Sequence, residues 1–126
     1  LQPVYDEPEF VVRNLWRLYG GWYDGNPAHL KPAPDAQVAS EIADLAGGAT
    51  TLAARAETLS GQGDHRLACH LAELAALAAP EDTGVHRVRA EVYRRRAQDE
   101  RSLMAKGIYA AAARESEEIT SAAGDT

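Results

Sequence analysis

The stretch Asp64–Pro80, DHRLACHLAELAALAAP, contains every signal that a helix needs. Asp64 is a good N-cap, because its carboxylate accepts hydrogen bonds from the free backbone N–H groups of the first helical turn. Leucines recur at the three- and four-residue spacing of one helical face, at Leu67, Leu71, Leu74 and Leu77. Pro80 ends the pattern, because proline cannot continue a helix. The stretch therefore predicts a helix over residues 65–79.

Helical patterns of the same kind fill the rest of the chain. We expect about six helices, over residues 8–23, 36–45, 49–60, 65–79, 83–99 and 101–118, with Asp35 as the N-cap of the second. Residues 1–9 are expected to form a strap that leads into the first helix, and residues 119–126 a frayed tail. Alanine, the best helix former, occurs 25 times, and no alternating run of strand-forming residues occurs. The chain is therefore predicted to be one all-α domain over residues 1–126.

The apolar faces of these helices are predicted from their large aliphatic side chains. The second helix carries Val38, Ile42 and Leu45, and the fifth carries Val85, Val88 and Val92 with Tyr93 beside them. The sixth is expected to point Leu103, Met104, Ile108 and Ala111–Ala112 inward.

The net charge of −6 argues against a nucleic-acid partner, which needs a clustered basic surface. The run Arg94–Arg96 makes no patch, because neighbours on a helix point about 100° apart.

Cys69 is the single cysteine, so no intrachain disulfide can form, and its apolar surroundings predict a small buried side chain. No stretch approaches the roughly 18 apolar residues of a membrane span, and a membrane partner is not expected. Localisation stays open between cytoplasmic and secreted.

A repeat is visible in the last four expected helices, which form two helix–turn–helix pairs with a period of about 34 residues. The first pair has small residues and a closing proline at tetratricopeptide-like positions: Ala56, Ala68, Ala75 and Pro80. In the second pair Ala90 and Tyr93 recur, whereas Ser102 and Tyr109 replace the small residues. The pattern predicts helical hairpins with degenerate tetratricopeptide-like packing.

Catalytic and metal-binding residues are not predicted in this chain. His65 and His70 are five residues apart, whereas zinc ligands on one helix prefer a spacing of three or four. His86 lies beside Arg87 and Arg89 and is expected to face solvent. No phosphate-binding glycine loop and no Ser–His–Asp spacing occur. We expect no catalytic residue, metal ligand or cofactor within this sequence.

The expected first helix has two apolar stripes, which together cover more than half of its surface. One is Val11, Leu15, Leu18 and Trp22, and the other is Val12, Trp16, Tyr19 and Tyr23. A helix of this kind needs cover on two sides, so a subunit or domain interface is predicted at Val12, Trp16, Tyr19, Trp22 and Tyr23. Gly25, Asn26 and Pro27 form the turn that stops this helix.

The segment Leu18–Leu30, LYGGWYDGNPAHL, resembles a signature of the alkyl sulfatase family. Further similar segments follow in the same order and with similar spacing, namely Leu45–Gly48, Gly63-Asp64, Ala68–Pro80, Arg89-Ala90 and Tyr109–Glu115. The resemblance covers roughly residues 8–116.

The resemblance implies that this is the dimerisation domain of a larger sulfate-ester hydrolase. The parent enzyme would carry an N-terminal metallo-β-lactamase domain with two zinc ions that activate water. Two copies would form a homodimer, and a sterol-carrier-like domain follows in many members. One departure is that the metal-binding histidine of well-known members has no counterpart near Phe10. The alternative interpretation is a stand-alone tetratricopeptide-like module that binds a peptide.

Overall fold

The computed structural model describes residues 25–124, and every regular element in them is helical, which confirms the all-α prediction. Chain contacts divide the protein into two compact units, residues 1–34 and 35–126, which are described separately. In the first unit, Pro27–His29 forms the short 3-10 helix η1. The second unit contains α2 (Asp35–Ala46), α3 (Ala49–Gly61), α4 (His65–Ala78), α5 (Thr83–Asp99) and α6 (Leu103–Gly124). The predicted strap and the helix over residues 8–23 lie outside the described residues.

The helix ends follow from local capping chemistry. Asp64 accepts a hydrogen bond from the backbone N–H of Leu67 at 3.4 Å, as predicted. Asp82 does the same for Val85 at 3.1 Å at the start of α5, whose bounds agree with the prediction. Asp35 is the first residue of α2 rather than the residue before it, so its assignment as an N-cap is corrected.

The last helix differs most from the prediction. It begins at Leu103 because Ser102 Oγ accepts a hydrogen bond from the backbone N–H of Ala105 at 3.3 Å. It continues to Gly124, so residues 119–124 are helical instead of belonging to a frayed tail. Ile119 and Thr120 are half-buried, and the Thr120 hydroxyl donates to the Ser116 carbonyl at 2.9 Å. Packing and this bond extend the helix beyond Glu118.

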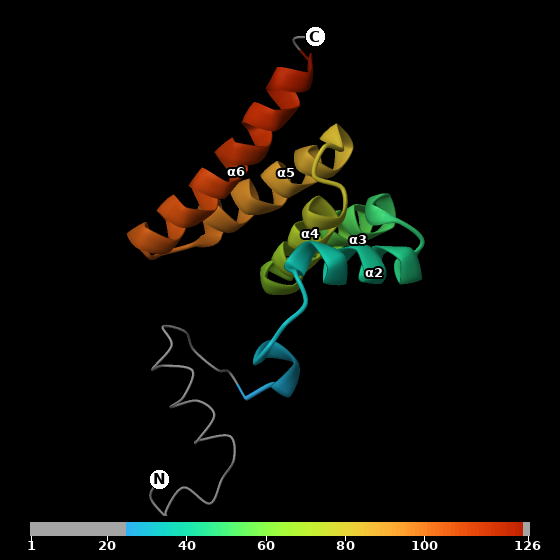
Figure 1. Cartoon of the computed structure of the whole chain (residues 1–126). Coiled ribbons are helices and arrows are strands. Elements are labelled where there is room, and N and C mark those ends of the chain that lie inside the picture. Colours follow the sequence, from blue (N-terminus) through green and yellow to red (C-terminus); the bar gives the residue numbers. More distant parts are fainter. Residues whose placement is uncertain (1–24, 125–126) are drawn as a thin grey trace, which may run out of the picture. The chain divides into compact units, whose positions relative to one another are not determined.

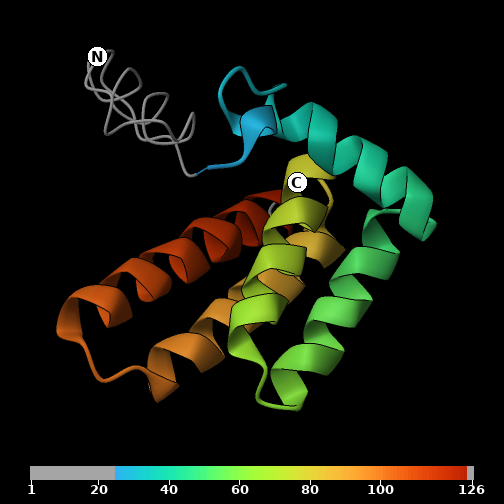
Figure 2. The same ribbon diagram turned by 90° about the horizontal axis from the view of Figure 1, so that it is seen from below.

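The second unit is built from two antiparallel helical hairpins, α3–α4 and α5–α6, with α2 packed against α3 and α4 (Figures 1 and 2). The contact between α5 and α6 is the most extensive of all, and α6 lies close to no other described helix. The connection between α5 and α6 forms the free end of their hairpin, away from α2 (Figure 2).

The core consists of small side chains, and the predicted apolar faces need correction. In α2 the buried residues are Ala39 and Ala43, whereas Leu45 is 88% exposed and Val38 is also exposed. In α4 the leucines Leu67 and Leu77 are exposed. The buried side of α4 is formed by Ala68, Cys69, Ala72, Ala75 and Ala76. Helices that cross closely have room only for small side chains at the crossing, which is why alanine replaces leucine there.

The small residues that the predicted tetratricopeptide-like repeat places at helix crossings lie in this closely packed core. Ala56, Ala68 and Ala75 have no exposed surface, and Val92 and Tyr93 of α5 pack in the same cluster as Ala56 and Ala68. Helical hairpins are thus present, while their classification as tetratricopeptide-like stays a prediction. Cys69 is buried as predicted, and burial raises the pKa of its thiol.

Candidate interaction surface

The turn predicted at Gly25, Asn26 and Pro27 lies in the first unit. Gly25 has a φ of 94°, a left-handed conformation that favours glycine. The Asn26 side chain accepts a hydrogen bond from the backbone N–H of Ala28 at 3.0 Å, and Pro27 opens the 3-10 turn. The predicted interface residues on the preceding segment, Val12, Trp16, Tyr19, Trp22 and Tyr23, lie outside the described residues.

Three large apolar side chains near the start of α6 are exposed to solvent: Leu103 (85% exposed), Met104 (78%) and Ile108 (62%). The prediction that they point inward is wrong, and so is that for Ala111, which is also exposed. The buried side of α6 carries Ala113 and Ser116 instead, with Tyr109 and Ala112 half-buried. The sequence-based assignment favoured the larger side chains, whereas α5 accepts the smaller ones.

These exposed residues share one side of the helix. We use the name α6 face for Leu103, Met104, Gly107, Ile108 and Ala111, which are all exposed and uncharged. Positions 104, 107, 108 and 111 follow the three- and four-residue spacing of one helical stripe. A Cβ atom added at Gly107 would meet nothing within 4 Å, so the centre of the face is open. Contiguous exposed apolar surface of this kind is typical of interaction sites.

The opposite side of α6 is fixed to α5 by aromatic and cationic contacts. The rings of Tyr93 and Tyr109 are stacked with centroids 6.0 Å apart. The Arg96 guanidinium lies 4.6 Å from the centroid of the Tyr109 ring. Further along, Arg94 forms a two-fold hydrogen bond with Glu117 at 2.6 and 3.2 Å. The α6 face is therefore carried by a helix whose position is set along its length.

A buried polar network also attaches α6 to α5. The Arg89 side chain is 9% exposed, and its Nη1 donates to the Ala112 carbonyl at 2.9 Å and to Ser116 Oγ at 2.8 Å. Its Nε donates to Glu73 Oε1 of α4 at 2.8 Å, so one guanidinium joins three helices. The Tyr93 hydroxyl donates to the same carboxylate oxygen at 2.8 Å. Burial, and then this carboxylate, raise the pKa of Tyr93.

His86 belongs to this network, and the prediction that it faces solvent is wrong, since only 4% of its surface is exposed. Its Nε2 lies 2.8 Å from the Pro80 carbonyl oxygen, which can only accept, so Nε2 donates. Ser116 Oγ accepts from Arg89 and lies 2.9 Å from His86 Nδ1. Donors and acceptors balance when the Ser116 hydroxyl donates to His86 Nδ1. Ser116 is completely buried, so this Ser–His pair is structural and meets no substrate.

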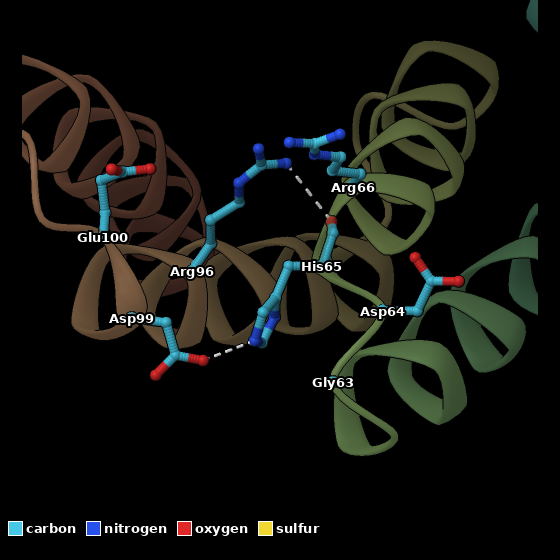
Figure 3. Close-up of a pocket in the computed structure, with 7 residues that line it drawn as sticks. All are labelled: Gly63, Asp64, His65, Arg66, Arg96, Asp99 and Glu100. Carbon is cyan, nitrogen blue, oxygen red and sulfur yellow. Dashed lines mark hydrogen bonds and ion pairs between the residues drawn. The ribbon is translucent and has the colours of Figure 1, made fainter.

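A pocket of about 330 Å³ lies where the start of α4 meets the end of α5 (Figure 3). His65 Nε2 is 2.6 Å from Asp99 Oδ2, and its Nδ1 is buried without a hydrogen-bond partner. Arg96 Nη1 donates to the His65 carbonyl at 3.5 Å. Because one ring nitrogen is paired and the other is buried, the imidazole offers no free nitrogen to a substrate. The pair links the start of α4 to the end of α5.

Among residues 25–124, no set of three or more His, Cys, Asp or Glu side chains could hold a metal ion. The same residues contain no helix that is long and apolar enough to cross a membrane.

Comparison with known proteins gives consistent matches. A family model described as alkyl sulfatase dimerisation matches residues 1–118. An (R)-specific secondary-alkylsulfatase of a Pseudomonas species is 28% identical over 91 residues, which are 72% of this chain and 14% of the relative. A linear primary-alkylsulfatase of Pseudomonas is 28% identical over 95 residues, 75% of this chain and 18% of the relative. An alkyl/aryl-sulfatase of Saccharomyces cerevisiae is 38% identical over 55 residues, 44% of this chain and 8% of the relative. The matched part of this chain spans less than a fifth of each relative.

Proposed function

Because the chain belongs to the alkyl sulfatase dimerisation family, we propose that it joins two copies of a sulfate-ester hydrolase into a homodimer. The observation that carries this proposal is the exposure of Leu103, Met104 and Ile108 on one side of α6. Large apolar side chains left in water favour association, because covering them removes apolar surface from solvent. The fixed position of α6 supports the same role, since a surface that does not reorganise loses less entropy on binding.

On this proposal, hydrolysis takes place in another domain of the parent protein. The relatives are named as sulfatases, and this chain matches less than a fifth of each. The family resemblance implies a metallo-β-lactamase domain that holds two zinc ions, and the ions would supply an activated water. Residues 25–124 do not fit such a centre, because they contain no metal-binding cluster. Their part is to hold two catalytic domains together.

The proposal is tested by sedimentation equilibrium or light scattering of the full chain at micromolar concentrations. We expect a dimer. A strict monomer would refute assembly through this chain and favour the alternative, a tetratricopeptide-like module that binds a peptide. In the parent protein, removal of zinc with a chelator should abolish sulfate-ester hydrolysis. The isolated chain should stay dimeric in the same chelator.

A further inference from the structure

We infer that the α6 face packs against the same face of a second copy, with the two α6 helices antiparallel. This inference rests on the proposed function, because it names the surface through which the copies meet. The occupant is a second copy of this chain, since the family to which the chain belongs is described by its dimerisation. A segment of the parent protein covering the face is the competing outcome.

The first argument is the composition of the face. Its five residues are exposed and none carries a charge, whereas the later part of α6 carries paired charges such as Glu117 with Arg94. Lys106, the charged residue between positions 103 and 111, borders the face beside Leu103, and it lies away from Met104 and Ile108 because it is two residues from each. A face without charge meets a like face without burying an unpaired ion.

The second argument is that the face is self-complementary in size. A symmetric dimer requires that when residue i meets residue j, residue j also meets residue i. In an antiparallel pair with its two-fold axis between positions 107 and 108, Met104 lies opposite Ala111 of the partner subunit. Ile108 then lies opposite Gly107 of the partner subunit. Met104 and Ile108 thus each meet a small residue, which is the pattern that lets helices interlock.

The third argument is access. α6 has α5 as its only close helical neighbour among the described residues. Its first turns lie at the free end of the α5–α6 hairpin, away from α2 (Figures 1 and 2). Gly107 has open space at its Cβ position, so a second helix can approach the backbone there. Tyr109, which points into the contact with α5, keeps the face turned outward.

The first experiment measures the dimer dissociation constant of the full chain by sedimentation. Ile108→Glu is expected to weaken the dimer about tenfold or more, because it places a charge at the centre of an apolar interface. Leu45→Glu is the matched control: it makes the same change at an apolar residue of α2 that is 88% exposed, and the dimer should keep its affinity. Gly107→Leu should weaken the dimer while raising the melting temperature of the single copy, because glycine is a poor helix former.

The second experiment tests the antiparallel pairing. Met104→Cys together with Ala111→Cys should give a covalent dimer on mild oxidation, since the two positions meet between copies. They cannot pair within one copy, because seven residues of helix separate their Cα atoms by about 10 Å, beyond disulfide reach. Ala111→Cys alone should not form a covalent dimer, whereas a parallel pair would link it to its own counterpart and overturn the inferred arrangement.

The possible results separate the two proposals. If the unmodified chain is a monomer, the proposed function and this inference fail together. If it is a dimer that Ile108→Glu and Gly107→Leu leave unchanged, the face serves another partner, and only this inference fails. Weakening by Leu45→Glu as strong as that by Ile108→Glu would also count against α6 as the specific contact.

Discussion

Ser116→Ala is the most informative single change in the core. The side chain of Ser116 has no exposed surface, and its Oγ is shared by Arg89 Nη1 at 2.8 Å and His86 Nδ1 at 2.9 Å. Arg89 keeps the Ala112 carbonyl and the Glu73 carboxylate after the change. His86 Nδ1, in contrast, is left buried without a partner.

The expected loss of folding free energy follows from the one buried group, His86 Nδ1, that Ser116→Ala leaves without a hydrogen-bond partner. One buried acceptor without a partner costs about 1–3 kcal/mol of folding free energy. For a domain of about 100 residues, each kcal/mol lowers the melting temperature by roughly 4–8 °C. The change is measured by thermal and urea unfolding at one fixed protein concentration, because a dimer is stabilised by mass action. Ser121→Ala, at an exposed position of the same helix, is the control and should change stability by less than about 0.5 kcal/mol.

A double-mutant cycle separates the network from a simple packing effect. His86→Leu removes the acceptor that Ser116→Ala leaves stranded, so the two changes together should cost less than the sum of the single changes. Additive losses would show that the two side chains do not act as a unit. A Ser116→Ala protein as stable as the Ser121→Ala protein would refute the assignment of the hydroxyl as a shared hydrogen-bonding group.

Three further changes test the rest of the fold. Ala68→Leu should destabilise by about 1–3 kcal/mol in urea unfolding, because the position is fully buried, whereas Ala54→Leu at an exposed position of α3 should be nearly neutral. Gly48→Ala should cost about 1–3 kcal/mol through its backbone φ of 125° alone, since an added Cβ meets nothing within 4 Å. The hydrogen bond from Arg94 lowers the pKa of Glu117 below its ordinary value of 4.5, so its contribution to stability is present above that pH and is lost as the pH falls through the lower, folded-state value. Glu117→Gln should therefore lose less stability than the unmodified chain between pH 5 and pH 3. Equal acid sensitivity of the two proteins would contradict this link, and Glu118→Gln, a carboxylate without an ion pair among the described residues, is the control.

Helix positions could be predicted from the sequence, because the signals that start and stop helices are local. Asp64 caps α4 with its own side chain, and α5 has its predicted bounds of Thr83 and Asp99. The buried side of each helix could not be predicted in the same way. Hydrophobicity ranks Leu45 and Leu67 above Ala43 and Ala68, but the space at a helix crossing depends on how close the two backbones lie, which no single helix encodes.

The polar network shows the same limit for the site. The sequence neighbours of His86 predict a surface position, yet its partners are Pro80 and Ser116, six and 30 residues away. The helical extension beyond Glu118 likewise depends on contact with α5. The repeat of about 34 residues predicts two helical hairpins, but it does not indicate which side chains meet between them.

The alanine core and the exposed α6 face have one physical origin. Hydrophobic stabilisation is about 25 cal/mol per Å² of apolar surface buried, and a core of alanines buries little surface per residue. Leu103, Met104 and Ile108 are large apolar side chains that a single copy leaves in water. A chain with this distribution gains less from folding alone than from folding and association together. Alanine on the inner side of α6 also brings α6 close to α5, while the larger side chains on its outer side remain available to a second copy. The small residues on the inner side of α6 therefore allow the hairpin to form, and the large residues on its outer side provide the surface for assembly. Because folding and dimerisation are linked by mass action, a substitution that destabilises the α5–α6 hairpin should also weaken the dimer.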